Sequence, residues 1–364
     1  MSIREKKKKT NTEERITTAI FMAIVAAALY GISSPMSKLL LVEISPTFLA
    51  ALLYLGAGLG MGIINIIRKQ NKKEQVEAKI TKKEMPYVVG MIVLDVIAPI
   101  LLMLGLTMTT SANASLLNNF EIVATSLIAL FIFKEAIGKR MWIAITFITL
   151  STIILSVDDF SAFSFSTGSF LVVAACLCWG FENNCTRMLS LKDPLQIVVI
   201  KGLGSGLSAL LISFAFNSIN GNAFYILLAL LLGFFAYGLS IYFYIMSQRD
   251  LGASRTSAYY AAAPFIGVFI SWLILKEEIT ITFMMTLVVM LTGAYFAISE
   301  KHRHVHIHPE MTHEHRHTHT DMHHNHIHEP EVVGEHSHEH AHERIEHEHT
   351  HVPDLHHRHT HENI

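Results

Sequence analysis

Long apolar stretches recur along the chain, and short charged segments separate them. Each stretch has about 20 residues, the length that an α-helix needs to cross the hydrocarbon core of a bilayer. The stretches cover residues 16–42, 46–67, 86–108, 112–133, 141–157, 167–188, 194–217, 223–247, 253–275 and 279–299. The pattern therefore predicts an all-α integral membrane protein with ten transmembrane helices.

Composition and motifs narrow the class of protein. Of the 364 residues, 51% are hydrophobic and only 16% are charged, and the mean hydropathy is +0.40, which is typical of a membrane protein. The sequence has no Gly-Lys phosphate-binding loop and no His-Glu-x-x-His motif, so it predicts neither an ATP-driven pump nor an enzyme. The formal net charge of -2 predicts no nucleic-acid partner, and the expected partner is the lipid bilayer.

Lysine and arginine are distributed unevenly between the predicted loops. They crowd residues 1–15 and the linker of residues 68–83, whereas alternate loops hold almost none, with Lys276 as the exception. Because cytoplasmic loops carry an excess of these residues, the N-terminus is predicted to be cytoplasmic. Ten crossings return the C-terminus to the same side, and we expect the protein in the plasma or inner membrane of the cell.

The membrane region is predicted to be duplicated. A shift of 142 residues places Lys134-Glu135 onto Lys276-Glu277, and a shift of 149 aligns the first predicted helix with the sixth. Each copy holds five helices, and because five is odd, the second copy enters the membrane in the opposite orientation. Such inverted repeats are typical of secondary transporters. Chance similarity between apolar helices is the alternative.

The predicted organisation has five parts. They are a basic cytoplasmic N-terminus, a first five-helix repeat, an external loop, a second five-helix repeat and a cytoplasmic histidine-rich tail, over residues 1–15, 16–157, 158–166, 167–299 and 300–364.

Three segments carry a resemblance to a known family. They are TSANASLLNNFEIVATSLIALFIFKE, WGFENNCTRML and LGASRTSAYYAAAPFIGVFISWLILKEE, and they resemble EamA-type repeats of the drug/metabolite transporter superfamily over residues 16–299. The resemblance implies two inverted five-helix units around a central cavity. It also implies a secondary carrier that moves a small solute, often in exchange for protons or another solute. Family repeats often carry a Glu-Pro pair, and here one repeat has Glu121-Ile122 and the other Ala263-Pro264.

Three acidic residues lie inside predicted spans: Asp95, Glu121 and Glu182. A carboxylate at membrane depth costs a few kcal/mol or more, so it usually faces a cavity or a partner. Asn118 and Thr125 are three and four residues from Glu121, so a continuous helix places all three on one face. Because proton coupling needs a carboxyl group that is neutral and charged in turn, Glu121 is the main candidate. Asp95 either opens a polar pocket or is held by a hydroxyl or amide and only fixes packing.

Other polar and aromatic residues are candidates for the lining of a substrate cavity. Asn183 follows Glu182 directly in the sequence. Tyr237 and Tyr260 could stack on an organic substrate, although tyrosine also lies at membrane interfaces for other reasons. Pro264 is included because it occupies the proline position of the family pair.

Cys178, Glu182 and Cys185 are spaced by four and three residues, which places them on one helix face. Two thiolates and a carboxylate suit a divalent metal such as zinc. Cysteine is also a small residue that packs helices in membranes, so the alternative is simple packing. The sequence leaves both interpretations open.

Glycines recur at four-residue spacing in two predicted helices, in the runs Gly56–Gly62 and Gly202–Gly206. Small residues at this spacing allow transmembrane helices to approach closely. The contact could form within one chain or between the two chains of a homodimer.

All 23 histidines lie in the tail, between His302 and His361. The first runs alternate histidine with another residue and contain His302, His304, His306, His308, His313, His315, His317 and His319. A tract this polar predicts disorder in the absence of metal. Imidazole suits zinc, nickel, cobalt and copper, so one of these metals is the expected ligand of the tail, although no cofactor is required. The alternative is a tract that binds metal in vitro without a role in the cell.

Three functions follow from these patterns. The first is secondary active transport of a small metabolite or drug-like solute by alternating access, with protons or a counter-solute as the coupling species. The second is transport of a transition metal that the tail collects in the cytoplasm. The third is a membrane metal sensor that transports nothing.

Overall fold

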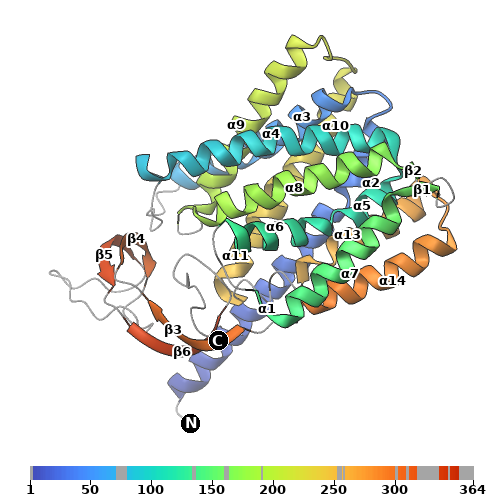
Figure 1. Ribbon diagram of the computed structural model, residues 1–364. Helices are drawn as coiled ribbons and strands as arrows, with labels where there is room; N and C mark the ends of the chain where they lie inside the picture. The colour runs from blue at the N-terminus through green and yellow to red at the C-terminus, as the bar shows by residue number, and fades with distance from the viewer. Residues whose placement is uncertain are drawn as a thin grey trace.

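The computed structural model forms one bundle of helices (Figure 1). It describes the backbone of residues 3–70, 80–132, 137–159, 164–189, 192–251, 256 and 259–299, and of four tail segments, 302–308, 311–317, 336–342 and 345–351. Within the helical region, side chains are described from residue 16 to residue 299, apart from residues 71–79, 133–136, 158–165, 190–191, 248–255 and 257–258.

The first half of the bundle contains α1 to α7. The bounds are α1 Ile3–Gly31, α2 Ser33–Leu40, α3 Pro46–Gln70, the short 3-10 helix η1 Lys82–Glu84, α4 Met85–Met108, α5 Ser111–Leu117, α6 Phe120–Phe131 and α7 Lys139–Ser156. Local sequence fixes several of these ends. The Thr110 hydroxyl, for example, caps α5 by accepting from the Asn113 amide at 3.1 Å.

The second half begins with two short strands and continues with helices. The bounds are β1 Val157–Asp159, β2 Ser164–Phe165, α8 Thr167–Arg187, α9 Pro194–Ala215, α10 Ala223–Leu232, the π-helix η2 Gly233–Leu239, α11 Ser240–Leu251, α13 Ala263–Ile270, the π-helix η3 Ser271–Leu275 and α14 Ile281–Ile298. Asp193 caps α9 by accepting from the Leu195 amide, and Pro194 occupies the first turn, where its missing N–H costs nothing.

The prediction of a helical membrane protein is confirmed. Each of the ten predicted stretches contains helix, and among the described residues eight helices are long and apolar enough to cross a membrane. Two predicted stretches, the sixth and the ninth, are not among these eight helices, and each absence has a physical reason. The helix α8 has 21 residues, but its polar run of residues 182–184 lowers its hydropathy. In the ninth stretch, Ala263–Leu275 forms a shorter apolar helix, and several of the residues before it lie outside the described residues.

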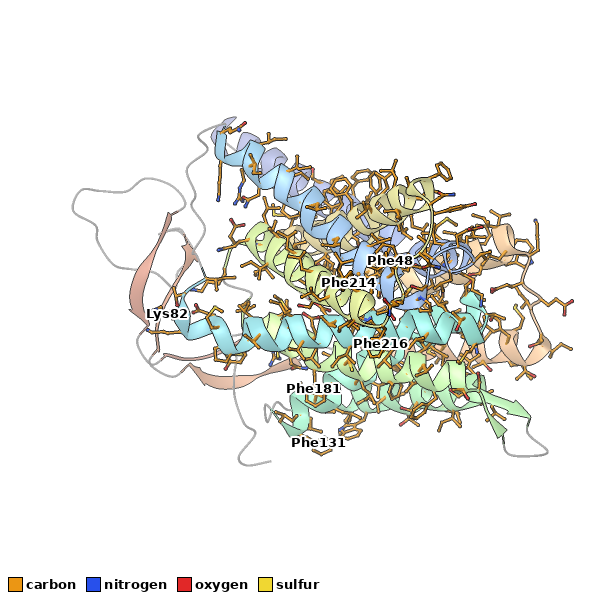
Figure 2. All side chains as sticks on the ribbon, turned by 90° about the horizontal axis from the view of Figure 1, so that it is seen from above. Phe48, Lys82, Phe131, Phe181, Phe214 and Phe216 are labelled. Atoms are coloured by element: carbon orange, nitrogen blue, oxygen red, sulfur yellow. The ribbon has the colours of Figure 1, made fainter. Side chains whose placement is uncertain are left out.

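The outside of the bundle is apolar. Large hydrophobic side chains such as Phe131, Phe214 and Phe216 are more than 70% exposed, and Figure 2 shows them among the side chains along the helices. An exposed apolar surface of this extent is expected for a protein whose solvent is lipid.

Two of the predicted transmembrane stretches contain a short turn that separates two labelled helices. The turn lies at Ile32 between α1 and α2, and at Asn118 and Asn119 between α5 and α6. The backbone stays helical through both turns, so Ile16–Leu40 and Ser111–Phe131 are each one helix of membrane length. Glu121 lies in the first turn of α6.

Close packing between α3 and α9 depends on glycine. A Cβ atom added to Gly202 would collide with the backbone of Gly58, whereas one added to Gly62 would meet nothing within 4 Å. The predicted glycine contact is therefore formed within one chain.

We expect Gly202→Ala to lower the free energy of unfolding by about 1–3 kcal/mol, because the helices would have to separate. Gly62→Ala is the matched control and should leave stability within about 0.5 kcal/mol. Thermal unfolding of the two purified proteins in the same detergent measures the difference. Equal unfolding temperatures would contradict the packing described here.

Four segments of the tail are paired strands. The strand β3 His302–His308 pairs antiparallel with β6 Ile345–His351, and β4 Met311–His317 pairs with β5 His336–His342. The alternation of histidine with another residue has the two-residue period of a strand. The prediction of disorder otherwise falls on residues outside the described part of the tail. His319 lies outside the described residues, as do the side chains of the whole tail.

Candidate functional site

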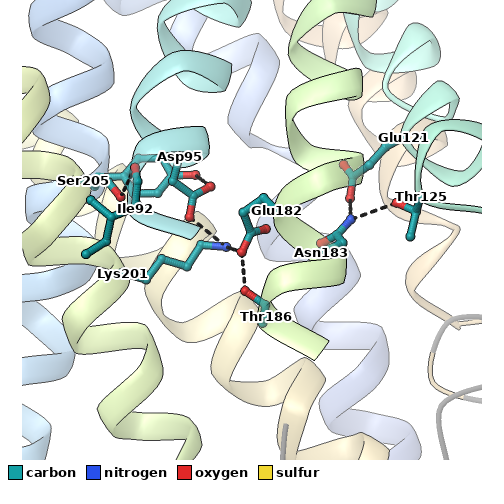
Figure 3. Close-up of polar contacts among 10 residues, drawn as sticks. Ile92, Asp95, Glu121, Thr125, Glu182, Asn183, Thr186, Lys201 and Ser205 are labelled. Carbon is teal, nitrogen blue, oxygen red and sulfur yellow. Dashed lines mark hydrogen bonds and ion pairs between the residues drawn. The ribbon is translucent and has the colours of Figure 1, made fainter. Parts of the chain in front are cut away.

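A buried lysine joins two acidic residues in the middle of the bundle. The Nζ atom of Lys201, on α9, lies 3.1 Å from Asp95 Oδ2 on α4 and 3.0 Å from Glu182 Oε1 on α8 (Figure 3). Asp95 and Glu182 are each 1% exposed. We call Asp95, Lys201 and Glu182 the ion triad. Two hydroxyl groups complete it: Tyr54 donates to Asp95 Oδ1 at 2.8 Å, and Thr186 donates to Glu182 Oε1.

Sequence reasoning missed Lys201 and Tyr54. A signal for the lysine was present, since Lys201 is a charged residue inside the apolar stretch 194–217, just as the three acids lie inside theirs. Tyr54 offered no such signal, because tyrosine is common in membrane helices and its partner comes from another helix.

A second polar cluster lies on the other side of α8. The side-chain amide of Asn183 donates to Glu121 Oε1 at 2.6 Å and to Thr125 Oγ1 at 3.2 Å. Asn183 and Glu182 are adjacent in the chain, so α8 presents one to Glu121 and the other to Lys201, as Figure 3 shows. Glu121, Thr125 and Asn183 are partly exposed, unlike the carboxylates of the ion triad.

Five tyrosines form a chain of ring contacts that ends at the ion triad. Tyr30 stacks on Tyr260 with centroids 5.7 Å apart, and Tyr244 meets Tyr260 edge-on at 4.8 Å. Tyr237 contacts Tyr30 at 6.0 Å and Tyr54 at 5.4 Å. Through Tyr54, this tyrosine cluster reaches Asp95.

Two further cavity candidates have their own settings. Asn118 ends α5, and its Oδ1 lies 3.9 Å from Cys176 Sγ on α8, the helix that also carries Asn183, the partner of Glu121 and Thr125. Pro264 is in the first turn of α13, where proline is compatible with a helix.

The structure does not assemble the cysteine metal site that the spacing suggested. Within the part of the chain that the structure describes, no group of three histidine, cysteine, aspartate or glutamate side chains is placed to hold a metal. Glu182 is held by Lys201, and Cys178 and Cys185 are free thiols. Metal binding by the tail histidines stays a prediction.

One end of the bundle is tied together by Glu277. Its carboxylate accepts from the amides of Ser111 and Ala112, each at 2.8 Å, and so caps α5 from the segment that follows η3. Lys38 donates to the carbonyl oxygens of Leu106 and Thr109 at the same end. The Glu277 contacts connect the two predicted repeats.

Buried charges on several membrane-length helices define a multi-pass membrane protein with an intramembrane charged site, which is the usual mark of an ion or solute pathway. The sequence profile of the EamA-like transporter family matches residues 17–157 and 166–299. The chain belongs to this family, and it is a membrane transporter by class.

Two further similarities agree with that assignment. The chain is 30% identical to an uncharacterized transporter of Methanothermobacter thermautotrophicus over 288 residues, which cover 75% of this chain and 83% of the relative. A protein of known crystal structure superposes with a TM-score of 0.58 at 15% identity, over 77% of this chain and 95% of its own, which shows the fold alone.

Proposed function

We propose that this protein is a secondary active transporter that moves a small metabolite or drug-like solute by alternating access, and that the ion triad couples this movement to protons. The observation that carries the proposal is the position of Lys201 between two buried carboxylates. One cation shared by two acids leaves the triad with a net negative charge when all three groups are ionised.

A net charge in apolar surroundings is unfavourable, and a single proton on either carboxyl group removes it. The triad is therefore suited to hold one proton in one conformation and to release it in another, when Lys201 moves relative to Asp95 or Glu182. The proton would be taken from water on one side of the membrane and returned on the other.

Helix packing supports the inverted repeat. A Cβ atom on Gly31 would meet Ala263 and Ile266, and one on Gly180 would meet Ala124. The shift of 149 residues relates the two glycines, and the shift of 142 relates Ala124 to Ile266. Corresponding helix pairs in the two copies therefore make corresponding contacts, as repeats of opposite orientation would.

The same two shifts relate Glu182 to Ser33 and Asp95 to Tyr237. Ser33 donates a hydrogen bond to the Tyr237 hydroxyl at 2.9 Å. The two positions that correspond to Glu182 and Asp95 are therefore also in contact. One pair is ionisable and the other is neutral. We infer that a single copy of the repeat carries the proton, and that both termini lie in the cytoplasm, as the lysine and arginine distribution predicts.

The metal-carrier and metal-sensor hypotheses have less support. The described membrane helices present no three-ligand metal site, so both hypotheses depend on the tail. We therefore favour an organic solute.

Proton movement in liposomes tests the proposal. Full-length protein is reconstituted with a trapped pH-sensitive dye, and a panel of amines, amino acids, sugars and carboxylates is added outside. At least one solute is expected to drive a proton flux, which Asp95→Asn should reduce to the level of empty liposomes. Lys192→Met is the control, because Lys192 is another buried lysine. Its Nζ atom lies 3.4 Å from Glu84 Oε1, and it takes no part in the ion triad. Solute transport without proton movement would contradict the coupling.

A further inference from the structure

We propose that the histidine-rich tail is a zinc-binding module in which histidines from opposite strands share a metal ion, with one such site in each of its two ribbons. We call the pair β3 and β6 the outer ribbon, and the pair β4 and β5 the inner ribbon. The inference is separate from the proposed transport function, because it uses no residue of the membrane helices. It is drawn from the register of the strands and from the chemistry of imidazole.

The register of both ribbons places histidine opposite histidine. Three successive histidines of β3 are each paired with a histidine of β6, and the pairs are His302 with His351, His304 with His349 and His306 with His347. The inner ribbon repeats this arrangement, and its pairs are His313 with His340, His315 with His338 and His317 with His336. Because alternate positions of a strand share one face, the three paired positions of each ribbon lie on the same face.

The sequence maintains this pairing across both ribbons. Histidine occupies even-numbered positions in β3 and odd-numbered positions in β4, and it changes again from even positions in β5 to odd positions in β6. Residues 309–310 separate β3 from β4, and residues 343–344 separate β5 from β6, so the two changes fall at corresponding places. A slip of one residue in either ribbon would place these histidines opposite other residue types. The two arms of the tail are thus matched to each other in sequence.

The opposite face of each ribbon carries other residues. In the outer ribbon its pairs are Arg303 with Thr350, Val305 with Glu348 and Ile307 with Glu346. In the inner ribbon its pairs are Thr312 with Ala341, Glu314 with Glu339 and Arg316 with Ser337. Histidine is therefore confined to one face of each ribbon, which a tract that is only polar does not require.

This arrangement of positions matches the ligand number of zinc. Directly opposed positions have Cβ atoms about 4.5–5.5 Å apart, and successive positions on one face lie about 6.5 Å apart along the strand. Zinc takes four ligands and binds histidine nitrogen at about 2.0–2.1 Å. Two successive pairs supply four imidazoles to one ion. Three pairs supply only one such set, and either choice of two successive pairs includes the middle pair of the ribbon.

A metal that joins two strands also stabilises their pairing. The unfolded tail does not hold the four ligands together, so the free energy of metal binding contributes to folding of the ribbon. Zinc would in this way favour the paired form of the tail, and the conformation of the tail would follow the concentration of free zinc.

Calorimetric titration with zinc tests the proposal on the full-length protein in detergent, after a chelator has removed bound metal. We expect about two tight sites per chain, one for each ribbon. His304→Ala combined with His349→Ala removes the middle pair of the outer ribbon and should leave one tight site. Adding His315→Ala and His338→Ala removes the other middle pair and should leave none, although most of the 23 histidines remain.

A matched control removes the same number of histidines from the strands without removing a pair. His308 lies opposite Ile345 and His342 opposite Met311, so His308→Ala combined with His342→Ala should retain both tight sites. Equal losses in the two double variants, or binding that falls in proportion to the number of histidines removed, would overturn the proposal and indicate an unpaired tract. Absence of tight zinc binding by the wild-type protein would overturn it as well.

Discussion

Lys201→Met is expected to lower the free energy of unfolding by about 3–5 kcal/mol. The substitution leaves the carboxylates of Asp95 and Glu182 buried without their shared cation. Breaking a buried ion pair from one side is costly because the partner keeps its charge and loses its compensation. Tyr54 still donates to Asp95, but a single hydroxyl does not replace an ammonium group.

Denaturant unfolding in detergent, followed by tryptophan fluorescence, measures this loss. Lys192→Met removes an equally buried lysine, but its partner Glu84 is partly exposed, so we expect a cost of about 1 kcal/mol. Adding Asp95→Asn to Lys201→Met should recover part of the stability, since one of the two uncompensated charges is then gone. An equal loss in the two lysine variants, with no recovery in the double variant, would show that the triad is only packing.

Glu121→Gln is expected to reduce solute transport by about a hundredfold while the protein remains folded. Glutamine has nearly the same shape and can still accept a hydrogen bond from Asn183, so the change removes charge and little else. Loss of a charge contact worth about 3 kcal/mol corresponds to about this factor. Uptake of radiolabelled solute into liposomes, with the solute taken from the panel described above, measures the effect.

Thr125→Val provides a graded comparison. Thr125 contacts the same Asn183 amide at 3.2 Å but carries no charge, so its removal should reduce uptake only severalfold. Glu121→Asp should lie between wild type and Glu121→Gln. If Thr125→Val and Glu121→Gln were equally damaging, the cluster would act by fixing the position of α8 and not by binding the solute.

Most of the helical fold could be predicted because it depends on the length of apolar stretches. A stretch of about 20 residues has few alternatives to a helix in a bilayer. The turn at Asn118 and Asn119 between α5 and α6 could not be predicted in this way, since the apolar pattern continues across it.

The candidate site could be predicted from the sequence only in part, for a related reason. Charges inside apolar stretches pointed to Asp95, Glu121 and Glu182, and the structure brings Asp95 and Glu182 together. Their link is Lys201, on a different helix from either. Spacing within one helix favoured Cys178 and Cys185 as neighbours of Glu182, but it contains no information about side chains that arrive from another helix.

The contacts of Glu277 with the amides of Ser111 and Ala112 bear on the balance between the two conformations that the proposed transport requires. Hydrogen bonds to a charged acceptor contribute about 1.5–3 kcal/mol each, so its two amide bonds amount to about 3–6 kcal/mol. Moving a two-state equilibrium from 1:99 to 99:1 takes about 5.5 kcal/mol. Under the proposed alternating access, one carboxylate that makes these contacts in only one of the two conformations would be strong enough to set which of them predominates before any solute arrives.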